Sequence, residues 1–391
     1  IKLEGQTVPQ EFAIADCDVD GLPYFDEVMA FTTSQGICAF FPIVAPKRYR
    51  VFVLRDNSTA VVDGRPQPPS LEEMQQHLKV RGLDQVRLSN PFWLTAFGIN
   101  ERHAKEYRHG RIFLAGDAAH VHSPVGGQGM NTGMQDAFNL AWKLAYVFCG
   151  RAWPSLLDSY NPEREPVGAE VVSKTATART MITLRHPVAQ QVRNKVVSWL
   201  SNFDFVRHKI AEQACELAVS YPNSPLNHDV HQGHAAWLLG GGVRPGQRAP
   251  DLQLVALEQG AWREVRLFEL MRDRNFHLIW FSGLKAEQDC EQRFHELCSW
   301  IRHSHCQWLR CHWIGTSKQF FPPSGGLGAL LWDEHSKAHQ AYGATQSSFY
   351  LIRPDGYVGL RCQPALLEEL QRYLERNGLR LAVPSQLKRG V

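Results

Sequence analysis

The stretch Arg111–Leu144, RIFLAGDAAHVHSPVGGQGMNTGMQDAFNLAWKL, constrains the fold of this chain more than any other part of its sequence. Its first six residues, Arg111–Gly116, form an apolar run that ends in glycine, which predicts a buried strand that leads into a loop. The loop reaches about Gly129. Apolar residues then recur at helical spacing over Met130–Phe148, and Gly150 stands where a C-terminal helix cap belongs. The predicted order is strand, glycine-rich loop, helix.

This order places polar and flexible groups where a ligand can bind. Asp117 follows the predicted strand directly, at the carboxyl edge where ligands of open α/β sheets bind, and its carboxylate could accept hydrogen bonds from sugar-like hydroxyls. Gly126, Gly127 and Gly129 would let the backbone approach a flat ligand, and the positive end of the helix would favour an electron-rich ring edge. Taken singly, an aspartate after a strand is typical of a turn or a helix cap. A glycine-rich loop before a helix is, by itself, typical of a tight connection.

A dinucleotide-binding fingerprint is excluded for this loop. That motif needs its first glycine at the strand end, whereas ten residues separate Gly116 from Gly127.

The segments before this stretch read mainly as antiparallel strands. Short apolar runs at Val28–Thr32, Ile37–Ile43 and Tyr49–Leu54 alternate with turn-forming residues, and Leu71–Val80 has the spacing of a short helix. Period-two alternation places Trp93, Thr95, Phe97 and Ile99 on one face of a further strand.

The segments after the stretch read first as helices and then as a separate domain. Helices are predicted at Trp153–Tyr160, Pro166–Thr183 and Pro187–Val219. Turn formers over Tyr221–Pro250 mark a boundary. Beyond it, strands at Leu278–Phe281, His312–Gly315 and Ser348–Ile352 alternate with helices at Ala286–His303 and Leu366–Asn377, which suggests a small α/β sandwich.

Length and composition exclude several classes of protein. At roughly 150 residues per domain, 391 residues predict two or three domains. A net charge of +3 is too small for an electrostatic nucleic-acid footprint. Nine scattered cysteines favour reduced thiols and a cytoplasmic location, and we find no apolar stretch long enough to span a membrane.

As a whole, Arg111–Leu144 closely resembles the second FAD-binding motif of the flavoprotein aromatic hydroxylases, which share the p-hydroxybenzoate hydroxylase fold. The resemblance continues downstream through LLDSYNPEREPV at Leu156–Val167, and upstream through single positions: Trp93, Phe97, Arg102, Ala104, Tyr107 and Arg111. It implies an α/β (α+β) fold that contains a mixed substrate-binding sheet, a helical segment and a C-terminal domain.

The resemblance also implies a set of cofactor contacts. Asp117 would bind the ribityl and pyrophosphate region of FAD, and Pro124 would lie beside the isoalloxazine ring. The remaining expected contacts come from the loop and the helix start: Gly126, Gly127, Gln128, Gly129, Met130 and Asn131. The helix dipole there would favour negative charge on the pyrimidine end of a reduced flavin. One departure is Ser123, where relatives commonly carry a second proline.

A second resemblance concerns the C-terminal part. VRPGQRAPD at Val243–Asp251 and SFYLIRPDGYVGLR at Ser348–Arg361 look like the thioredoxin-like domain of phenol hydroxylase and 3-hydroxyphenylpropionate hydroxylase. The chain contains no Cys-x-x-Cys, so disulfide exchange is not supported and a structural or assembly role is expected. The expected divisions are residues 1–108 (substrate sheet), 109–220 (FAD motif and helices), 221–250 (linker) and 251–391 (thioredoxin-like domain).

The family's N-terminal Gly-x-Gly-x-x-Gly unit and later Asp-Gly motif are not found in this chain, and Ile1–Asp20 resembles the segment that follows the Asp-Gly motif. We therefore expect the chain to be the C-terminal portion of a longer enzyme.

The remaining histidine, cysteine and aromatic patterns are more typical of structural residues than of metal or substrate sites. His120-x-His122 has metal-ligand spacing but falls in the flavin loop. The dense run at His303, His305, Cys306, Cys311 and His312 lacks paired short cysteine spacing, so no metal site is expected. Four aromatic residues are candidates to line a substrate pocket, although strand aromatics are more often core: Phe40, Phe41, Trp93 and Phe97.

The resemblance implies an FAD-dependent monooxygenase that uses NAD(P)H and O2 to place one oxygen atom on a phenolic or other electron-rich ring, the other leaving as water. The expected partners are a small aromatic substrate, O2 and, as an assembly, a homodimer, with no nucleic acid and no membrane. Two alternatives stay open: a non-catalytic remnant or binding scaffold, and a flavin-dependent reductase without oxygen insertion. The sequence identifies no general base.

Overall fold

The computed structural model describes residues 1–381 except 25, 34–35, 45–46, 57–60, 63–64, 125–126, 183–186, 202, 204–211, 213–214, 232–240, 259, 286, 288 and 319–326. The chain divides into two compact units, one comprising residues 1–133 and 165–216 and the other residues 134–164 and 217–391. This division differs from the expected one, because both long helices contribute to both units. No helix in the described part is long and apolar enough to cross a membrane.

The first unit is built on a six-stranded sheet in which every paired strand is antiparallel, in the order β10-β7-β1-β4-β3-β2. Its strands are β1 (Leu3–Asp20), β2 (Met29–Thr33), β3 (Gly36–Val44), β4 (Arg48–Asp56), β7 (Arg87–Ala104) and β10 (His120–Val121). Two short hairpins accompany it, β5 (Val61–Val62) with β6 (Arg65–Pro66), and β8 (Arg108–His109) with β9 (Ile112–Phe113). The antiparallel strands predicted between residues 28 and 54 are confirmed.

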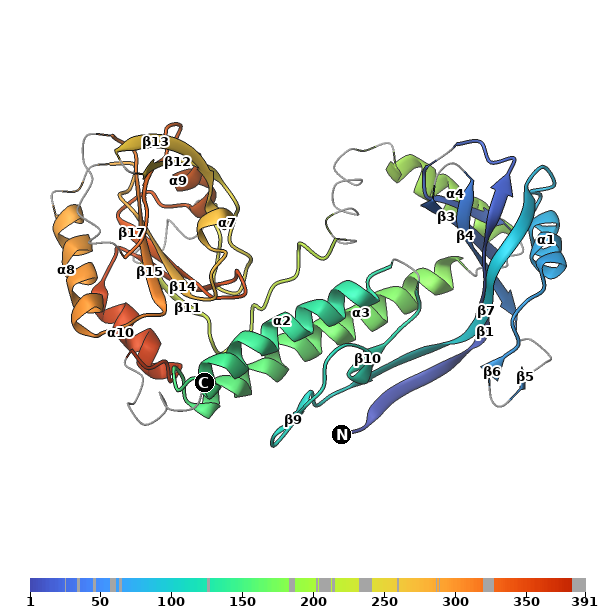
Figure 1. The fold of residues 1–391 in the computed structure, drawn as a ribbon, viewed down its shortest axis with the longest axis horizontal. Helices are drawn as coiled ribbons and strands as arrows, with labels where there is room; N and C mark the ends of the chain where they lie inside the picture. Colours follow the sequence, from blue (N-terminus) through green and yellow to red (C-terminus); the bar gives the residue numbers. More distant parts are fainter. Residues whose placement is uncertain are drawn as a thin grey trace. The chain divides into compact units, whose positions relative to one another are not determined.

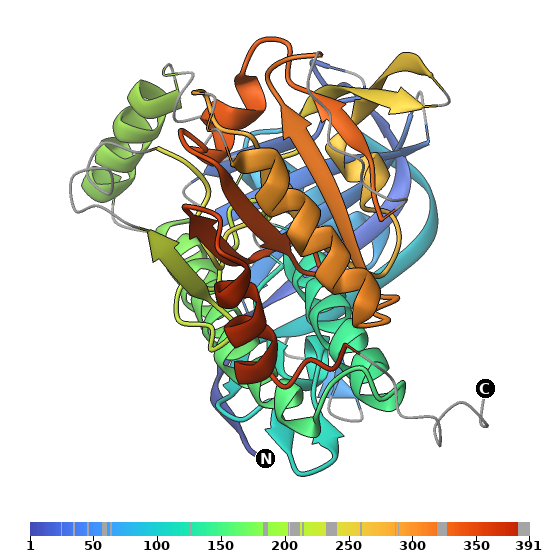
Figure 2. The ribbon, with the colours of Figure 1, turned by 90° about the vertical axis from the view of Figure 1, so that its left-hand side faces the viewer.

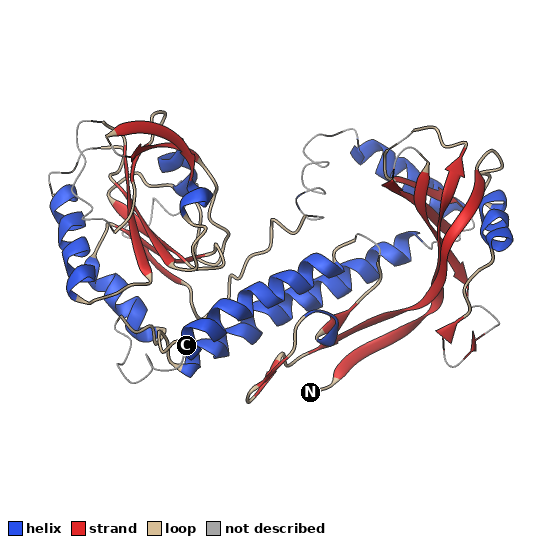
Figure 3. Cartoon of the chain, in the orientation of Figure 1, coloured by secondary structure: helices blue, strands red, loops and turns tan. Residues whose placement is uncertain are grey.

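One face of this sheet is covered by α1 (Leu71–Val80), as Figures 1 and 3 show. Ser70 caps the helix by accepting a hydrogen bond from the backbone N–H of Glu73. The apolar stripe carries Met74 and Leu78 into a core with Ala15, Val51 and other sheet residues. The predicted helix boundaries are confirmed, because the spacing and the cap agree.

The helical segment contains α2 (Gly129–Phe148), a 3₁₀ helix η2 (Pro154–Ser159), α3 (Tyr160–Ile182) and α4 (Pro187–Ser201). The long helix predicted after the glycine-rich loop is confirmed as α2. Its end is closed by Gly150, whose φ of +69° suits glycine and whose N–H donates to the carbonyl of Val147. The segment predicted as an α-helix at Trp153–Tyr160 is instead mainly 3₁₀. The helix predicted at Pro187–Val219 is confirmed as α4 up to Ser201, but the described residues 215–218 near its predicted end form turns instead.

The second unit contains an eight-stranded mixed sheet in the order β11-β18-β17-β14-β15-β16-β12-β13. Its strands are β11 (His228–His231), β12 (Gln253–Glu258), β13 (Ala261–Arg266), β14 (Phe276–Phe281), β15 (Leu309–Gly315), β16 (Leu330–Trp332), β17 (Ser348–Ile352) and β18 (Val358–Gln363). The three strands predicted here are confirmed. β11 falls within the stretch expected to be a linker, where it pairs in parallel with β18 as an edge strand.

Helices cover both faces of this sheet. The helices α8 (Cys290–His303) and α10 (Leu367–Arg376) lie over one face, as Figure 2 shows, and share a core with Trp280, Trp308 and Trp313. The short helices α7 (Leu267–Leu270) and α9 (Lys337–Tyr342) contribute to the core on the other face. The sequence prediction of an α/β sandwich with helices near residues 286–303 and 366–377 is confirmed.

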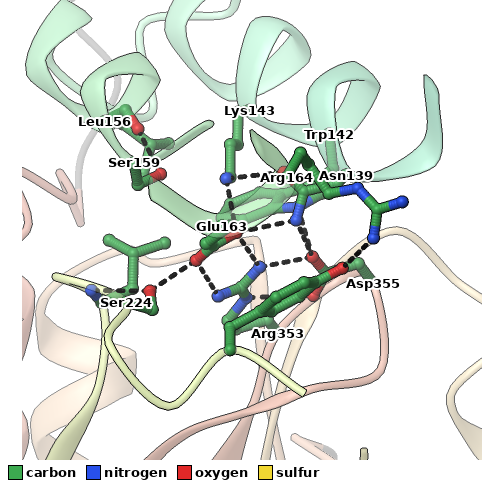
Figure 4. Close-up of polar contacts among 12 residues, drawn as sticks. Asn139, Trp142, Lys143, Leu156, Ser159, Glu163, Arg164, Ser224, Arg353 and Asp355 are labelled. Atoms are coloured by element: carbon green, nitrogen blue, oxygen red, sulfur yellow. Dashed lines mark hydrogen bonds and ion pairs between the residues drawn. The ribbon is translucent and has the colours of Figure 1, made fainter. Parts of the chain in front are cut away.

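A buried charge network joins α2, α3 and the β17–β18 turn within the second unit (Figure 4). The carboxylate of Glu163 accepts hydrogen bonds from Arg353 at 2.6 and 2.9 Å and from Lys143 at 2.7 Å. It also accepts from Asn139 at 2.7 Å and from Ser224 at 2.5 Å. The side chains of Glu163, Lys143 and Arg353 are fully buried.

Burial and pairing oppose each other in this network. Burial alone would raise the pKa of Glu163, but Arg353 and Lys143 outweigh it and hold that pKa well below its usual range. Burial lowers the pKa of Lys143 to about 8, against the opposing effect of Glu163. Arg353 also donates a hydrogen bond to the carboxylate of Asp355. That carboxylate accepts a further hydrogen bond, of 3.0 Å, from the indole N–H of Trp142. Glu163 and Arg353 lie in the two sequence stretches singled out above, LLDSYNPEREPV and SFYLIRPDGYVGLR.

The cysteine- and histidine-rich run is mostly core. Cys306, Cys311 and His312 are buried, whereas His303 and His305 are exposed. The described residues contain no group of three or more His, Cys, Asp or Glu that could hold a metal ion, and all nine cysteines are unpaired.

His312 makes the second unit sensitive to acid. Its ring lies 2.9 Å from that of His277, whose other nitrogen lies 2.7 Å from Asp273, and burial lowers the pKa of His312 to about 3. A folded pKa below the ordinary 6.5 means that the unfolded chain takes up the proton first, so stability is full above pH 6.5 and falls as pH drops toward 3. We expect a loss of about 2.5 kcal/mol in unfolding free energy between pH 7 and about 4.5 from this group alone.

Urea unfolding at several pH values measures this loss. The substitution His312→Gln should flatten the acid-side slope, and the exposed control His335→Gln should leave it unchanged. An unaltered slope in His312→Gln would contradict the assignment.

Candidate functional site

The turn that follows the β8–β9 hairpin carries the predicted carboxylate. The run Arg111–Gly116 is not the buried strand that its apolar composition predicts, because only Ile112–Phe113 pairs, with the two residues of β8, and Ile112 is exposed. The chain then enters a short 3₁₀ helix, η1 (Gly116–Ala118). Asp117 is exposed on η1, and the described residues offer its carboxylate no hydrogen-bond partner. The carboxylate is therefore available to a ligand.

Two glycines bring η1 against the first turns of α2. Gly116 has a φ of +57°, which favours glycine, and a Cβ there would lie 3.6 Å from the Cα of Gly133. A Cβ on Gly133 would in turn lie 3.2 Å from the Cα of Gly116. This close approach holds Asp117 near the start of α2.

The start of α2 supplies backbone donors and a positive dipole end. The helix begins at Gly129, as predicted, and Thr132 is the first of its residues whose N–H donates to a described carbonyl, that of Gln128. The preceding N–H groups of the helix donate to no carbonyl of a described residue, and at a helix N-terminus such groups can point at an anionic or electron-rich group. Met130 is exposed there, and Gln128, Gly129 and Asn131 are partly exposed.

His122 presents an acceptor beside this helix start. Its Nδ1 lies 2.8 Å from the carbonyl oxygen of Ser123, and burial lowers the pKa of His122, so the ring is neutral with its proton on Nδ1. The remaining nitrogen, Nε2, is buried without a partner among the described residues. A Cβ on Gly129 would lie 3.3 Å from it. A buried acceptor that lacks a donor fits a ligand that brings an N–H group.

The predicted cofactor residues thus fall along one continuous loop and helix start. Asp117, Pro124, Gly127 and the stretch Gln128–Asn131 belong to it. Gly126 lies outside the described residues.

Tyr107, which the sequence analysis named only as part of the resemblance, packs against His120 and Gly168. It is fully buried and stacks on His120, with ring centroids 6.2 Å apart. A Cβ on Gly168 of α3 would lie 2.0 Å from the Tyr107 hydroxyl oxygen, so only glycine fits there. The sequence analysis missed Gly168, although a glycine two residues after Pro166 inside a helix is an unusual signal.

This contact predicts a large effect of a single methyl group. The substitution Gly168→Ala should lower the unfolding free energy by about 1–3 kcal/mol, because the overlap outweighs the gain in helix propensity. Adding Tyr107→Phe should recover part of the loss by removing the hydroxyl. The control is Gly98→Ala in β7, where a Cβ meets no atom within 4 Å. Equal Tm values for Gly168→Ala and Gly98→Ala would contradict this interpretation.

The predicted substrate residues do not all share one face of the sheet. Phe41 and Trp93 are exposed, and Phe97 is partly buried against Phe12 on the same face, opposite α1. Phe40 is fully buried in the core under α1. Because neighbouring strand residues point to opposite faces, Phe40 cannot line a pocket with Phe41, and its prediction is corrected.

An ion pair that the sequence analysis missed lies on the same face as Trp93. Arg50 donates two hydrogen bonds of 2.7 Å to Asp16, and its guanidinium lies 5.0 Å from the centre of the Trp93 ring. Asp16 is buried and Arg50 partly exposed. The face therefore offers aromatic surface together with a fixed cation.

The chain is similar to known proteins in both sequence and structure. Residues 4–175 match the family described as FAD binding domain. The chain is 32% identical over 336 residues, 85% of its length, to a 6-methylpretetramide 4-monooxygenase of Streptomyces rimosus. Over most of its length the chain is thus similar to a monooxygenase.

Two further matches extend the comparison. A pentachlorophenol 4-monooxygenase of Sphingobium chlorophenolicum is 30% identical over 285 residues, which are 71% of this chain and 47% of the relative. The crystal structure of CabE, an aromatic hydroxylase from angucycline biosynthesis, superposes with a TM-score of 0.65 at 26% identity, over 97% of this chain and 66% of that one. The chain spans about half the length of these curated relatives, 55% in the case of the S. rimosus enzyme. The fold class expected from the resemblance, and FAD as the family's cofactor, are confirmed.

Proposed function

We propose that the protein to which this chain belongs is an FAD-dependent monooxygenase that hydroxylates a phenolic or other electron-rich aromatic substrate with NAD(P)H and O2. The observation that supports it most is the loop from Asp117 to the start of α2, where an exposed carboxylate, a helix N-terminus and Nε2 of His122, which has no partner among the described residues, lie together in a region matched to FAD-binding domains. The names of the relatives support the reaction and the aromatic substrate class.

The residues present fit a flavin in three ways. The carboxylate of Asp117 would accept hydrogen bonds from ribityl hydroxyls. The first N–H groups of α2 would stabilise negative charge at the pyrimidine end of the ring, and His122 would accept a hydrogen bond from a ring N–H. Pro124, Gly127 and Gln128 would complete the contacts. When bound, the flavin would supply the oxygen activation that protein side chains cannot perform.

The chain's own contribution to the reaction would be orientation and exclusion of water. The exposed aromatic side chains Phe41 and Trp93, with the partly buried Phe97, would hold a flat substrate against the sheet. The Arg50 guanidinium beside Trp93 would favour the phenolate form of that substrate.

The test is a reaction with ¹⁸O₂ in the presence of FAD, NADPH or NADH and a panel of phenols, analysed by mass spectrometry. Incorporation of one labelled atom into the product supports the proposal. Consumption of NAD(P)H without labelled product would indicate the reductase alternative, and a folded protein that takes up no FAD would indicate a scaffold.

Several finer expectations belong to the same proposal. A thioredoxin-like second unit is supported by the order β15-β14-β17-β18, with α8 between β14 and β15 and α10 after β18. A cytoplasmic location is supported by nine unpaired cysteines. A homodimer is proposed as the assembly, and gel filtration with light scattering would test it.

A further inference from the structure

Three polar residues meet at the carboxyl edge of the second unit's sheet, far along the chain from the flavin loop. Ser282 follows β14, Asp333 follows β16, and His339 lies in α9. The strands β14, β15 and β16 are parallel to one another, so their carboxyl ends lie at the same edge. This is the edge at which α/β sheets place catalytic groups.

The imidazole of His339 is held in one tautomer and one orientation. Its Nδ1 lies 2.8 Å from Oδ2 of Asp333, which also accepts the backbone N–H of His339 at 2.9 Å. Burial alone would raise the pKa of Asp333, but these hydrogen bonds lower it, so the group is a carboxylate and can only accept. Nδ1 therefore carries a hydrogen toward Asp333, and whenever the imidazole holds a single proton, Nε2 is the basic nitrogen.

The basic nitrogen faces a serine hydroxyl. Nε2 of His339 lies 3.5 Å from Oγ of Ser282, a distance typical of such pairs before a substrate tightens them. The hydroxyl also lies 3.2 Å from the carbonyl oxygen of Gly283, so its single proton has two acceptors. His339 is fully buried and packs edge-on against Phe281 at 5.1 Å, which prevents it from turning away.

Ser282 opens onto a small cavity of about 120 Å³. Its lining consists of Ser282, Gly283, Glu287, Cys290, Glu291, Trp313, Gly315, Thr316 and Ser317. The indole N–H of Trp313 is buried without an acceptor among the described residues, and a Cβ on Gly315 would lie 2.8 Å from it. An N–H donor without a partner, beside a nucleophile, is what an oxyanion requires.

The lining also limits the substrate. Glu287 and Glu291 are both acidic, and the described residues that line the cavity include no lysine or arginine. Glu287 is already bonded to Arg293 and to the backbone N–H of Ser347. The acidic surroundings disfavour anions, and the volume suits a short acyl group.

We propose that Ser282, His339 and Asp333 form a second catalytic site, which hydrolyses small uncharged esters by acyl transfer. Oγ of Ser282 forms a bond to the acyl carbon while its proton passes to Nε2 of His339, and the alcohol leaves with that proton. Water then attacks the acyl carbon, the bond to Oγ breaks, and Oγ regains a proton through His339. The Trp313 N–H stabilises the negative oxygen in both steps. Water is the only co-reactant.

The test is covalent labelling of the full chain with a fluorophosphonate, located by peptide mass spectrometry, together with the hydrolysis of p-nitrophenyl acetate. We expect labelling at Ser282 and loss of hydrolysis in Ser282→Ala, whose half-buried side chain can be removed without opening the core. Asp333→Asn and His339→Gln should slow labelling at least about tenfold, and Trp313→Phe should slow hydrolysis by roughly a hundredfold.

The chain offers a matched control. Ser299 lies 3.4 Å from His303 on the exposed surface of α8, and no described carboxylate bonds that histidine. Ser299→Ala should therefore leave both readouts unchanged. The proposal is overturned if folded wild-type chain is not labelled at Ser282, or if Ser282→Ala, with an unaltered melting curve, hydrolyses the ester at the wild-type rate. Neither result depends on flavin binding, so the proposed monooxygenase function stands or falls separately.

Discussion

Replacing Glu163 with glutamine is expected to destabilise the second unit by about 3–5 kcal/mol, more than any other single change considered for this unit. The substitution keeps the size of the side chain but removes the charge that Arg353 and Lys143 face. Both cations are fully buried, so they cannot recover hydration without unfolding the surrounding structure. Asp355 still pairs with Arg353, which leaves Lys143 as the main uncompensated charge.

Guanidinium unfolding followed by tryptophan fluorescence measures this effect, because Trp142, Trp280, Trp308 and Trp313 are buried in the second unit. The control is Glu258→Gln, which breaks the exposed pair with Arg263 and should leave the midpoint unchanged. A loss below about 1 kcal/mol in Glu163→Gln would show that the network relaxes or admits water, and would contradict its description as a closed buried cluster.

The second large effect is expected at Asp117. If its carboxylate accepts hydrogen bonds from a flavin's ribityl hydroxyls, Asp117→Ala should weaken FAD affinity by roughly tenfold to a hundredfold, the value of one or two hydrogen bonds to a charged group. Folding should not change, because the side chain is exposed and has no partner among the described residues. Asp117→Asn keeps an acceptor oxygen but no charge, so its FAD affinity should lie between those of the wild type and Asp117→Ala.

Flavin fluorescence titration of the purified chain gives the affinities, and thermal melting confirms the fold. Asp84→Ala, an exposed aspartate in the loop after α1, is the matched control and should bind FAD as the wild type does. Equal affinity in Asp117→Ala and Asp84→Ala would remove the carboxylate from the cofactor site.

Local signals in the sequence predicted local structure well. The boundaries of α1 follow from apolar spacing and the Ser70 cap, and the start of α2 follows from the end of the glycine-rich loop. The prediction of a buried strand at Arg111–Gly116 was wrong, because an apolar segment forms a strand only where another strand pairs with it. Here only the two residues of β8 pair with it. The error over Phe40 was avoidable, since strand alternation separates it from Phe41.

Long-range contacts could not be predicted in the same way. Glu163 and Arg353 are 190 residues apart, and the composition of the segment around either residue does not indicate that the two side chains pair. The same holds for Ser282 and His339, 57 residues apart, which meet only because parallel strands end at one edge of a sheet. The resemblance pointed to the stretch from Asp117 to Asn131 as a whole, but only the structure reveals that Nε2 of His122 has no partner among the described residues.

Hydrogen–deuterium exchange of the full chain with and without saturating FAD tests most directly whether the flavin binds at the loop and helix start. The account predicts slower exchange of backbone amides in peptides that cover Gly116–Gly133, and no change in peptides that cover β14, α8 or β17. Unchanged exchange at Gly116–Gly133 in chain that is shown to hold FAD, or protection confined to the second unit's sheet, would contradict it.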